Sequence, residues 1–311
     1  MRIVSLLPSA TEIVCALGLE DALVGITHEC DYPPAVRGLP AVTRSLLDHS
    51  ESSSEEIDHH VSRRLHDGLS LYALDAALLG ELRPDLIITQ ALCPVCGVEH
   101  SAVQHAARDV ASVFGGAPRV LSLEPRTLAD IFVTLEAVGA AAGVEQRAAQ
   151  LVGALQARVE RVRERAASAL TRPRVAFLEW MDPAYGPGQW APELIALAGG
   201  RVGFGQPGAD SHRVPWDDVI AFAPEVIVVA PCGFTLPRAL AEAREVLPRR
   251  HGWSALPAVR RGRVYVADGN AYFSRPSPRI VDSLELLAEL VQPELFAGWG
   301  PQGAWQTLAG S

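Results

Sequence analysis

The sequence predicts an α/β protein with two Rossmann-like lobes of mostly parallel sheet, joined by one long backbone helix. Short runs rich in β-branched residues recur along the chain, and each is followed by turn residues and then by a helical pattern. Near-continuous apolar strands that alternate with helices are typical of parallel sheets covered on both faces. The 311 residues also exceed the roughly 250–300 at which a single hydrophobic core stops growing, which favours two lobes.

Four strands are expected on each side of a central helical region. Those of the first half are Arg2–Leu6, Leu23–Thr27, Leu86–Gln90 and Arg119–Leu123. Those of the second half are Arg174–Trp180, Gly200–Gly205, Val226–Pro231 and Arg263–Asp268. The predicted organisation is an N-terminal α/β lobe over 1–125, linking helices over 126–172 and a C-terminal α/β lobe over 173–311.

Two helical patterns make up the connector. Apolar residues recur at helical spacing from Thr127 to Ala142, and after Gly143 a second stripe runs from Glu145 to about Thr171, opposite a face of Arg and Glu. At about 1.5 Å per residue, the second helix would be roughly 37 Å long. A rigid helix of this length between two lobes leaves little room for wide hinge motion.

The first helix of the chain is expected to begin at Ser9. The hydroxyl of this residue can cap the helix, and Glu12, three residues on, can close a capping box. Gly18 is expected to end the helix, because glycine readily adopts the left-handed conformation found there.

The composition excludes several classes of partner. The net charge of −9 and the absence of a dense Lys/Arg run argue against nucleic acid and anionic membranes. No run approaches the roughly 18 apolar residues of a membrane span. The N-terminal apolar run stops at Pro8, too early for a signal peptide, so a cytoplasmic location with mostly reduced cysteines is expected.

The polar segment 46–68 has two interpretations. It carries four histidines, which could form a metal-binding tract: His49, His59, His60 and His66. Its composition favours an exposed loop leading into a solvated helix.

Ligands of open parallel sheets bind beyond the carboxyl ends of the strands, and this rule selects the candidate site residues. The first lobe contributes Ser9, His28, Glu29, Cys30, Asp31, Cys93 and Cys96. The second contributes Glu179, Trp180, Trp190, Phe234, Tyr272, Phe273 and Arg275. Ionisable groups on one wall and flat rings on the other would suit a large, partly planar ligand, such as a metal complex.

A direct metal site is a second possibility. The neutral imidazole of His28 and the thiolates of Cys30, Cys93 and Cys96 would suit zinc, iron or cobalt. The spacing is not that of a zinc ribbon, and packing of the Cys93–Cys96 turn or a redox pair are alternatives. The sequence shows no GxSxG, P-loop or dinucleotide-binding motif and no evident general acid–base pair, so no catalytic residue is proposed.

The opening "RIVSLLPSATEIVCALG" resembles that of the helical-backbone (class III) periplasmic-binding-protein superfamily, which includes cobalamin, haem, siderophore and metal receptors of ABC importers. The motifs "HECDYP", "SLYALD", "TQALCPVC", "FLEW", "APELI" and "PCGF" are similar to its vitamin B12 (cobalamin)-binding branch. The resemblance implies two lobes joined by one long helix, a ligand cleft between them and only modest closure on binding.

The function that follows is non-catalytic binding of cobalamin, another corrinoid or a related metal complex between the lobes. Two alternatives stay open: direct zinc or iron binding by His28, Cys30, Cys93 and Cys96, and a thiol-dependent enzyme acting on a corrinoid. Relatives of this class dock on an ABC permease, which makes such a permease a possible partner.

Overall fold

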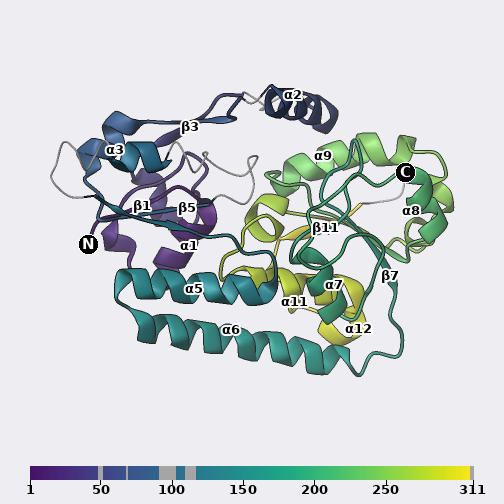
Figure 1. Cartoon of the computed structure of the whole chain (residues 1–311). Helices are drawn as coiled ribbons and strands as arrows, with labels where there is room; N and C mark the ends of the chain where they lie inside the picture. Colours follow the sequence, from purple (N-terminus) through teal and green to yellow (C-terminus); the bar gives the residue numbers. More distant parts are fainter. Residues whose placement is uncertain (48–51, 68, 91–102, 109–116, 309–311) are drawn as a thin grey trace. The chain divides into compact units, whose positions relative to one another are not determined.

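The computed structural model describes residues 1–47, 52–67, 69–90, 103–108 and 117–308 (Figure 1). The chain divides into two compact units. The first comprises 1–52, 56–125 and 129–154, and the second comprises 53–55, 126–128 and 155–311. Each unit is built around its own, mostly parallel sheet.

The sheet of the first unit has the order β2-β1-β5-β6, and all its pairs are parallel. Its strands are β1 (Ile3–Ser5), β2 (Leu23–Gly25), β5 (Leu86–Thr89) and β6 (Arg119–Ser122). A separate antiparallel pair, which the sequence did not predict, joins β3 (Thr43–Ser45) and β4 (Tyr72–Leu74). Every residue of β1 and β5 is buried, as expected for central strands with helices on both faces.

The helices of the first unit are α1 (Pro8–Ala16), α2 (Ser54–His66), α3 (Ala76–Leu82), α5 (Leu128–Ala142) and α6 (Glu145–Ala166), together with a helix over 103–108. The first residues of α2 and α5 and the second half of α6 belong to the second unit. The division thus runs through α6, the predicted long helix, whose 22 residues span about 33 Å.

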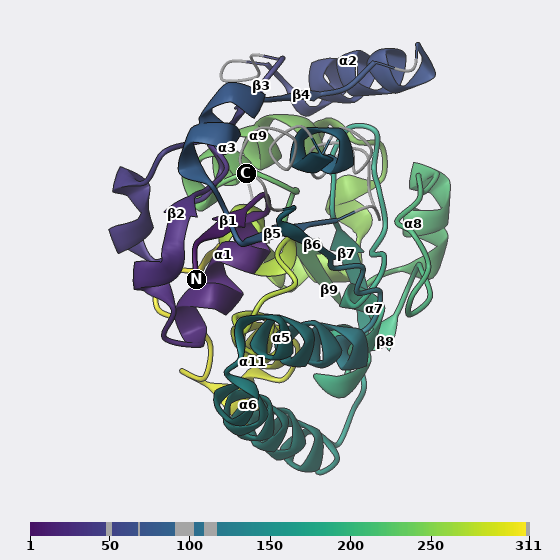
Figure 2. The ribbon, with the colours of Figure 1, turned by 60° about the vertical axis from the view of Figure 1, so that its left-hand side comes forward.

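Helices α5 and α6 lie side by side (Figure 2). A Cβ atom on Gly139 would lie 2.4 Å from the Cβ atom of Ala148, so only glycine permits this approach. Glycine at this position therefore fixes how closely the two helices pack in the first unit.

Helix α1 begins differently from the prediction. Leu7 is its N-cap residue and Pro8 its first helical residue, so Ser9 and Glu12 lie inside the helix and form no capping box. Proline suits this first position because its missing N–H would have no partner there. The predicted end is confirmed: Gly18 has a φ of +69°, its N–H donates to the Cys15 carbonyl, and the Leu19 N–H donates to the Val14 carbonyl.

The sheet of the second unit has the order β11-β10-β9-β7-β8. Its parallel strands are β7 (Arg174–Leu178), β8 (Arg201–Val202), β9 (Val226–Val229) and β10 (Val264–Ala267). The edge strand β11 (Trp305–Thr307) pairs antiparallel with β10 and was not predicted. All eight predicted strands are present, and the two-sheet α/β architecture is confirmed.

Helices cover both faces of the second sheet (Figure 1). They are α7 (Ala191–Leu197), α8 (Trp216–Phe222), α9 (Leu236–Val246), α10 (Pro257–Arg260), α11 (Ile280–Val291) and α12 (Pro293–Phe296). Helix α11 packs on α7 and β9, and α9 packs on β10 and β11.

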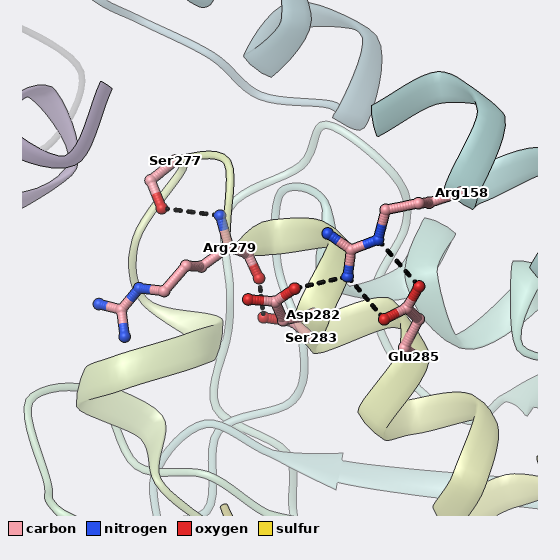
Figure 3. A network of polar contacts seen from close by, with 6 residues as sticks. All are labelled: Arg158, Ser277, Arg279, Asp282, Ser283 and Glu285. Carbon is pink, nitrogen blue, oxygen red and sulfur yellow. Dashed lines mark hydrogen bonds and ion pairs between the residues drawn. The ribbon is translucent and has the colours of Figure 1, made fainter. Parts of the chain in front are cut away.

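An ion-pair network joins α6 to α11 within the second unit (Figure 3). The Arg158 guanidinium donates to both carboxylate oxygens of Glu285, at 3.0 and 2.6 Å, and to Asp282 at 2.6 Å. Hydrogen bonds to Glu285 and Asp282 hold the pKa of Arg158 above its ordinary value. This network fixes the second half of the long helix to the unit that carries the second sheet.

Candidate functional site

The carboxyl ends of three neighbouring strands meet at one edge of the second sheet. Strands β7, β9 and β10 are adjacent and parallel, so the segments after them emerge on the same side. These segments carry Glu179 and Trp180 after β7, Phe234 after β9, and the run Asp268–Arg275 after β10. We call this region the carboxyl edge of the second sheet.

Two predicted aromatic residues are in contact at this edge. The rings of Trp180 and Phe234 pack edge to face, with centroids 5.1 Å apart. The Trp180 indole N–H donates to the main-chain carbonyl of Ser54, which belongs to the same unit, at 3.0 Å. Phe234 is only 2% exposed, whereas Trp180 is half-buried and keeps accessible surface.

Arg238 covers a face of the Phe234 ring. The Arg238 guanidinium carbon lies 3.9 Å from the ring centroid, which is a cation–π contact. Burial lowers the pKa of Arg238, and the nearby Glu242 carboxylate acts in the opposite direction. Arg238 was not predicted, although it lies four residues after Phe234, in the first turn of a helix that begins at the sheet edge.

The segment after β10 is organised by Asp268. One carboxylate oxygen accepts from the Ala271 N–H at 2.7 Å, and the other accepts from the Leu236 N–H at 3.2 Å. Residues Gly269–Phe273 form a single π-helical turn, a feature often found at functional sites. The Asn270 N–H donates to the Phe234 carbonyl at 3.1 Å, which ties this turn to the segment after β9.

Tyr272 and Arg275 lie in or directly after this turn. The Arg279 guanidinium lies 5.7 Å from the Tyr272 ring centroid, and Arg275 donates to the Asn270 side-chain oxygen at 3.0 Å. Tyr272 is half-buried, whereas Arg275 is 5% exposed. Arg279 was not predicted, because six residues separate it from Tyr272 in sequence.

Phe273 and Trp190 are placed in the interior of the unit. Phe273 is 5% exposed and packs edge to face on Phe177, at 5.1 Å between centroids. Trp190 is 6% exposed, and its indole N–H donates to the Phe273 carbonyl at 3.0 Å. Both side chains therefore pack in the interior beside the carboxyl edge of the second sheet, and they offer little surface to a ligand.

Glu179 supports the loop that follows β7. Its carboxylate accepts from the Gly188 N–H at 2.9 Å and from the Ser211 hydroxyl. Burial nevertheless raises the pKa of Glu179 to about 7, which outweighs the opposing effect of these hydrogen bonds. Glu179 is thus poised between its neutral and charged forms near neutral pH.

His28, the predicted metal-binding histidine of the first unit, is exposed and lies after β2. Its Nδ1 atom is 2.8 Å from the Thr43 hydroxyl, and its main-chain N–H donates to the same hydroxyl at 3.2 Å. The His28 ring lies 5.8 Å from that of Tyr72, whose hydroxyl donates to Glu29 at 3.4 Å. These contacts orient the His28 ring. Asp31, half-buried nearby, accepts from Arg37 through its main-chain carbonyl.

Cys30 instead points into the interior of the first unit and is 6% exposed. The Ser5 hydroxyl donates its hydrogen to the Leu7 carbonyl, and the Thr11 hydroxyl donates its hydrogen to Ser5. Thr11 therefore has no hydrogen left to donate to Cys30, so the Cys30 thiol is the donor in their contact of 3.0 Å. A thiol that donates is protonated, whereas metals bind the thiolate. Ser9 is also buried, at 6% exposure.

The predicted metal set is therefore not assembled among the described residues. Cys93 and Cys96 lie outside the residues that the structure describes. Within the described ranges, no group of three or more His, Cys, Asp or Glu side chains could hold a metal ion. The polar tract forms a solvated helix in α2, where His59 and His60 are neighbours with ring centroids 6.2 Å apart. His49 of this tract also lies outside the described residues.

No helix in the described part of the chain is both long and apolar enough to cross a membrane.

Comparisons with known proteins agree with this architecture. The uncharacterized ABC transporter substrate-binding lipoprotein YvrC of Bacillus subtilis is 24% identical over 306 residues, covering 95% of this chain and 81% of that protein. The vitamin B12-binding protein of Vibrio cholerae is 24% identical over 291 residues, covering 91% and 86%. A periplasmic haem-binding protein from Pseudomonas aeruginosa superimposes with a TM-score of 0.68 at 22% identity, covering 94% of this chain and 93% of the other.

A family model described as periplasmic binding protein matches residues 3–271, which include both sheets apart from the edge strand β11. The structural neighbours have the class III fold that the opening motif of the sequence suggested. The chain belongs to the periplasmic binding protein family.

Proposed function

We propose that this protein is a non-catalytic receptor for a corrinoid or a related planar metal complex, such as a haem, and that the carboxyl edge of the second sheet contacts the ring system. The observation that carries the proposal is the Trp180–Phe234 pair, with centroids 5.1 Å apart at that edge. Flat apolar side chains stack favourably on planar ligands. The names of the Vibrio cholerae and Pseudomonas aeruginosa relatives support the same ligand class.

Trp180 is the residue best placed to meet the ligand. Its N–H donates to the Ser54 carbonyl and its ring packs on Phe234, so its orientation is fixed before binding. A preoriented aromatic side chain loses little conformational entropy on binding and therefore contributes more to affinity. His28, in the first unit, stays a predicted metal ligand, and contacts with Thr43 and Tyr72 hold its ring in place.

Equilibrium titration tests this proposal. Cyanocobalamin and haem are added to the protein, and binding is read from the ligand absorbance spectrum and by calorimetry. Trp180→Ala should weaken binding about ten-fold, which corresponds to about 1.4 kcal/mol. Trp299→Ala, which removes a half-buried tryptophan that contacts Phe296 and Arg165, is the matched control and should leave affinity unchanged. Absence of saturable binding at micromolar protein for every ligand would refute the proposal.

A permease partner follows from the proposed role. The relative named as an ABC transporter substrate-binding lipoprotein supports an ABC permease as partner. The cytoplasmic location expected from the sequence stays a prediction, and fractionation of cells that express the full-length natural gene tests it. Direct zinc or iron binding and a thiol-dependent activity on a corrinoid also stay predictions, because both depend on Cys93 and Cys96.

A further inference from the structure

Ser54, the first residue of α2, is fully buried, whereas its neighbours Ser53 and Glu55 are exposed. Residues 53–55 belong to the second unit, although the segments on both sides of them belong to the first. The Ser54 hydroxyl is buried and has no hydrogen-bond partner among the described residues. The polar contacts that hold Ser54 in the second unit are therefore made by its main chain.

The Ser54 main chain connects two residues of the second unit. Its N–H donates to a carboxylate oxygen of Glu242, in α9, at 2.6 Å. Its carbonyl accepts from the Trp180 indole N–H at 3.0 Å. A carbonyl oxygen has two lone pairs, so the bond from Trp180 is compatible with the helical bonding of α2. Glu242 is thus linked to Trp180 through a single residue.

Glu242 acts as a cap for α2 that is supplied by another helix. The first N–H groups of a helix have no partner within it, and the helix dipole favours a negative charge beside them. Hydrogen bonds to a carboxylate are shorter and about twice as strong as those between neutral groups. The contact of 2.6 Å therefore makes Glu242 a strong anchor for Ser54.

We infer that Glu242 is a positioning residue for ligand binding: through the Ser54 main chain it holds the Trp180 ring in the orientation that meets the ligand. This inference rests on the proposed function, which assigns the ligand contact to Trp180. Loss of the Glu242 carboxylate leaves the Ser54 N–H without its acceptor, so residues 53–55 separate from Trp180 more often. The indole then spends less time in its binding orientation, and the apparent affinity falls by the same fraction.

The first arm of the test needs no ligand. Solvent exchange of the Trp180 indole proton is measured by NMR, and Trp180→Phe assigns its signal. Glu242→Leu should speed this exchange about ten-fold, because the loss of a hydrogen bond to a charged group frees Ser54 to open. Glu242→Gln keeps an oxygen acceptor and should change the exchange rate by no more than about three-fold. Glu245→Leu, at an exposed position of the same helix, is the matched control and should change nothing.

A second variant removes the same hydrogen bond from the donor side. Ser54→Pro has no main-chain N–H, and proline is well tolerated as the first residue of a helix. It should speed exchange of the Trp180 indole proton as Glu242→Leu does. Agreement of the two variants assigns the effect to the bond between Ser54 and Glu242, because they change different elements of the protein.

The second arm measures affinity for cyanocobalamin and haem by titration. Glu242→Leu should weaken binding about five- to ten-fold when Trp180 is present. In a Trp180→Phe background, which lacks the indole N–H, Glu242→Leu should cause no further loss. This double-mutant cycle separates positioning of Trp180 from general destabilisation, which would weaken binding in both backgrounds.

Three outcomes would overturn the inference. The first is equal exchange of the Trp180 indole proton in the wild type and Glu242→Leu, and the second is an equal loss of affinity with and without Trp180→Phe. The third is a Glu242→Gln protein that behaves like Glu242→Leu, which would assign the effect to the charge that Glu242 exerts on Arg238. Failure of both ligands to bind the wild type would instead refute the proposed function, while the exchange rates would still decide whether Glu242 positions Trp180.

Discussion

Arg158 and Glu285 are 127 residues apart in sequence, yet they form a bidentate ion pair with N···O distances of 3.0 and 2.6 Å (Figure 3). Arg158 lies in the second half of α6, and Glu285 lies in α11, which packs on β9. The side chains are 29% and 13% exposed, so the pair is screened less than a surface pair. It is a strong polar link between the long helix and the core of the second unit.

Replacing Arg158 should therefore be costly. Arg158→Leu leaves Asp282 and Glu285 close together with no cation between them, and we expect the free energy of unfolding to fall by about 2 kcal/mol. Urea denaturation followed by circular dichroism measures this change. Arg163→Gln, which breaks an exposed i,i+3 pair with Glu160 on the same helix, is the control and should have little measurable effect. Equal effects of the two substitutions would contradict this account.

The contribution of Glu179 to the free energy of unfolding should decrease as the pH rises. Its pKa is raised to about 7 in the folded protein, from an ordinary value near 4.5, so the folded state binds more protons between these values. Stability from this residue is therefore fully present below about pH 4.5 and is lost as the pH rises toward 7, by about 3 kcal/mol at most.

The substitution Glu179→Gln tests that direction. The amide oxygen can still accept from the Gly188 N–H but carries no charge at any pH. The variant should be more stable than the wild type at pH 8 and should lose less stability between pH 5 and pH 8. Denaturant titrations at pH 5, 6, 7 and 8 provide the measurement. An identical pH profile for both proteins would show that Glu179 does not cause the dependence.

The described cysteines should differ sharply in reactivity. Burial raises the pKa of Cys15 to about 12, and the Cys30 thiol is buried and donates to Thr11. Cys232, after β9, is exposed. Iodoacetamide at pH 8 should therefore modify Cys232 in the native protein well before Cys15 or Cys30, because alkylation requires an accessible thiolate.

Peptide mass spectrometry reads each cysteine of the chain separately. A urea-unfolded sample serves as the control, and there Cys15 and Cys30 should become reactive. Rapid labelling of Cys30 in the native protein would contradict its burial and the hydrogen-bond assignment.

The sequence was sufficient to predict the strands, because buried parallel strands read as short β-branched runs between turn residues. Strand β11 was missed, since only one of its three residues is even partly buried and its antiparallel pairing leaves no apolar run. The capping box at Ser9 failed because Pro8 can itself occupy the first helical position, which moves the N-cap from Ser9 to Leu7.

The candidate site was predicted less completely. The strand-end rule found Trp180 and Phe234, which are in contact, but it could not tell which aromatic residues would be buried. Trp190 and Phe273 lie in loops by sequence and in the core by structure. Arg238 lies in α9 and Arg279 directly precedes α11. Both were missed because their contacts with the rings depend on the tertiary fold.

Gly269 controls how closely the segment after β10 approaches the segment after β9. A Cβ atom at this position would lie 2.1 Å from the Pro231 carbonyl oxygen, and a main-chain atom cannot move aside as a flexible side chain can. Gly269→Ala should therefore push the two segments apart, destabilise the protein by about 2 kcal/mol or more and weaken ligand binding, because the Asn270–Phe234 hydrogen bond lies beside it.

Gly153→Ala in α6 is the matched control. Nothing lies within 4 Å of its Cβ position, so alanine should stabilise the helix by up to about 1 kcal/mol. Thermal unfolding and ligand titration of both variants give the comparison, and a Gly269→Ala protein with wild-type stability and affinity would show that the close approach is not required.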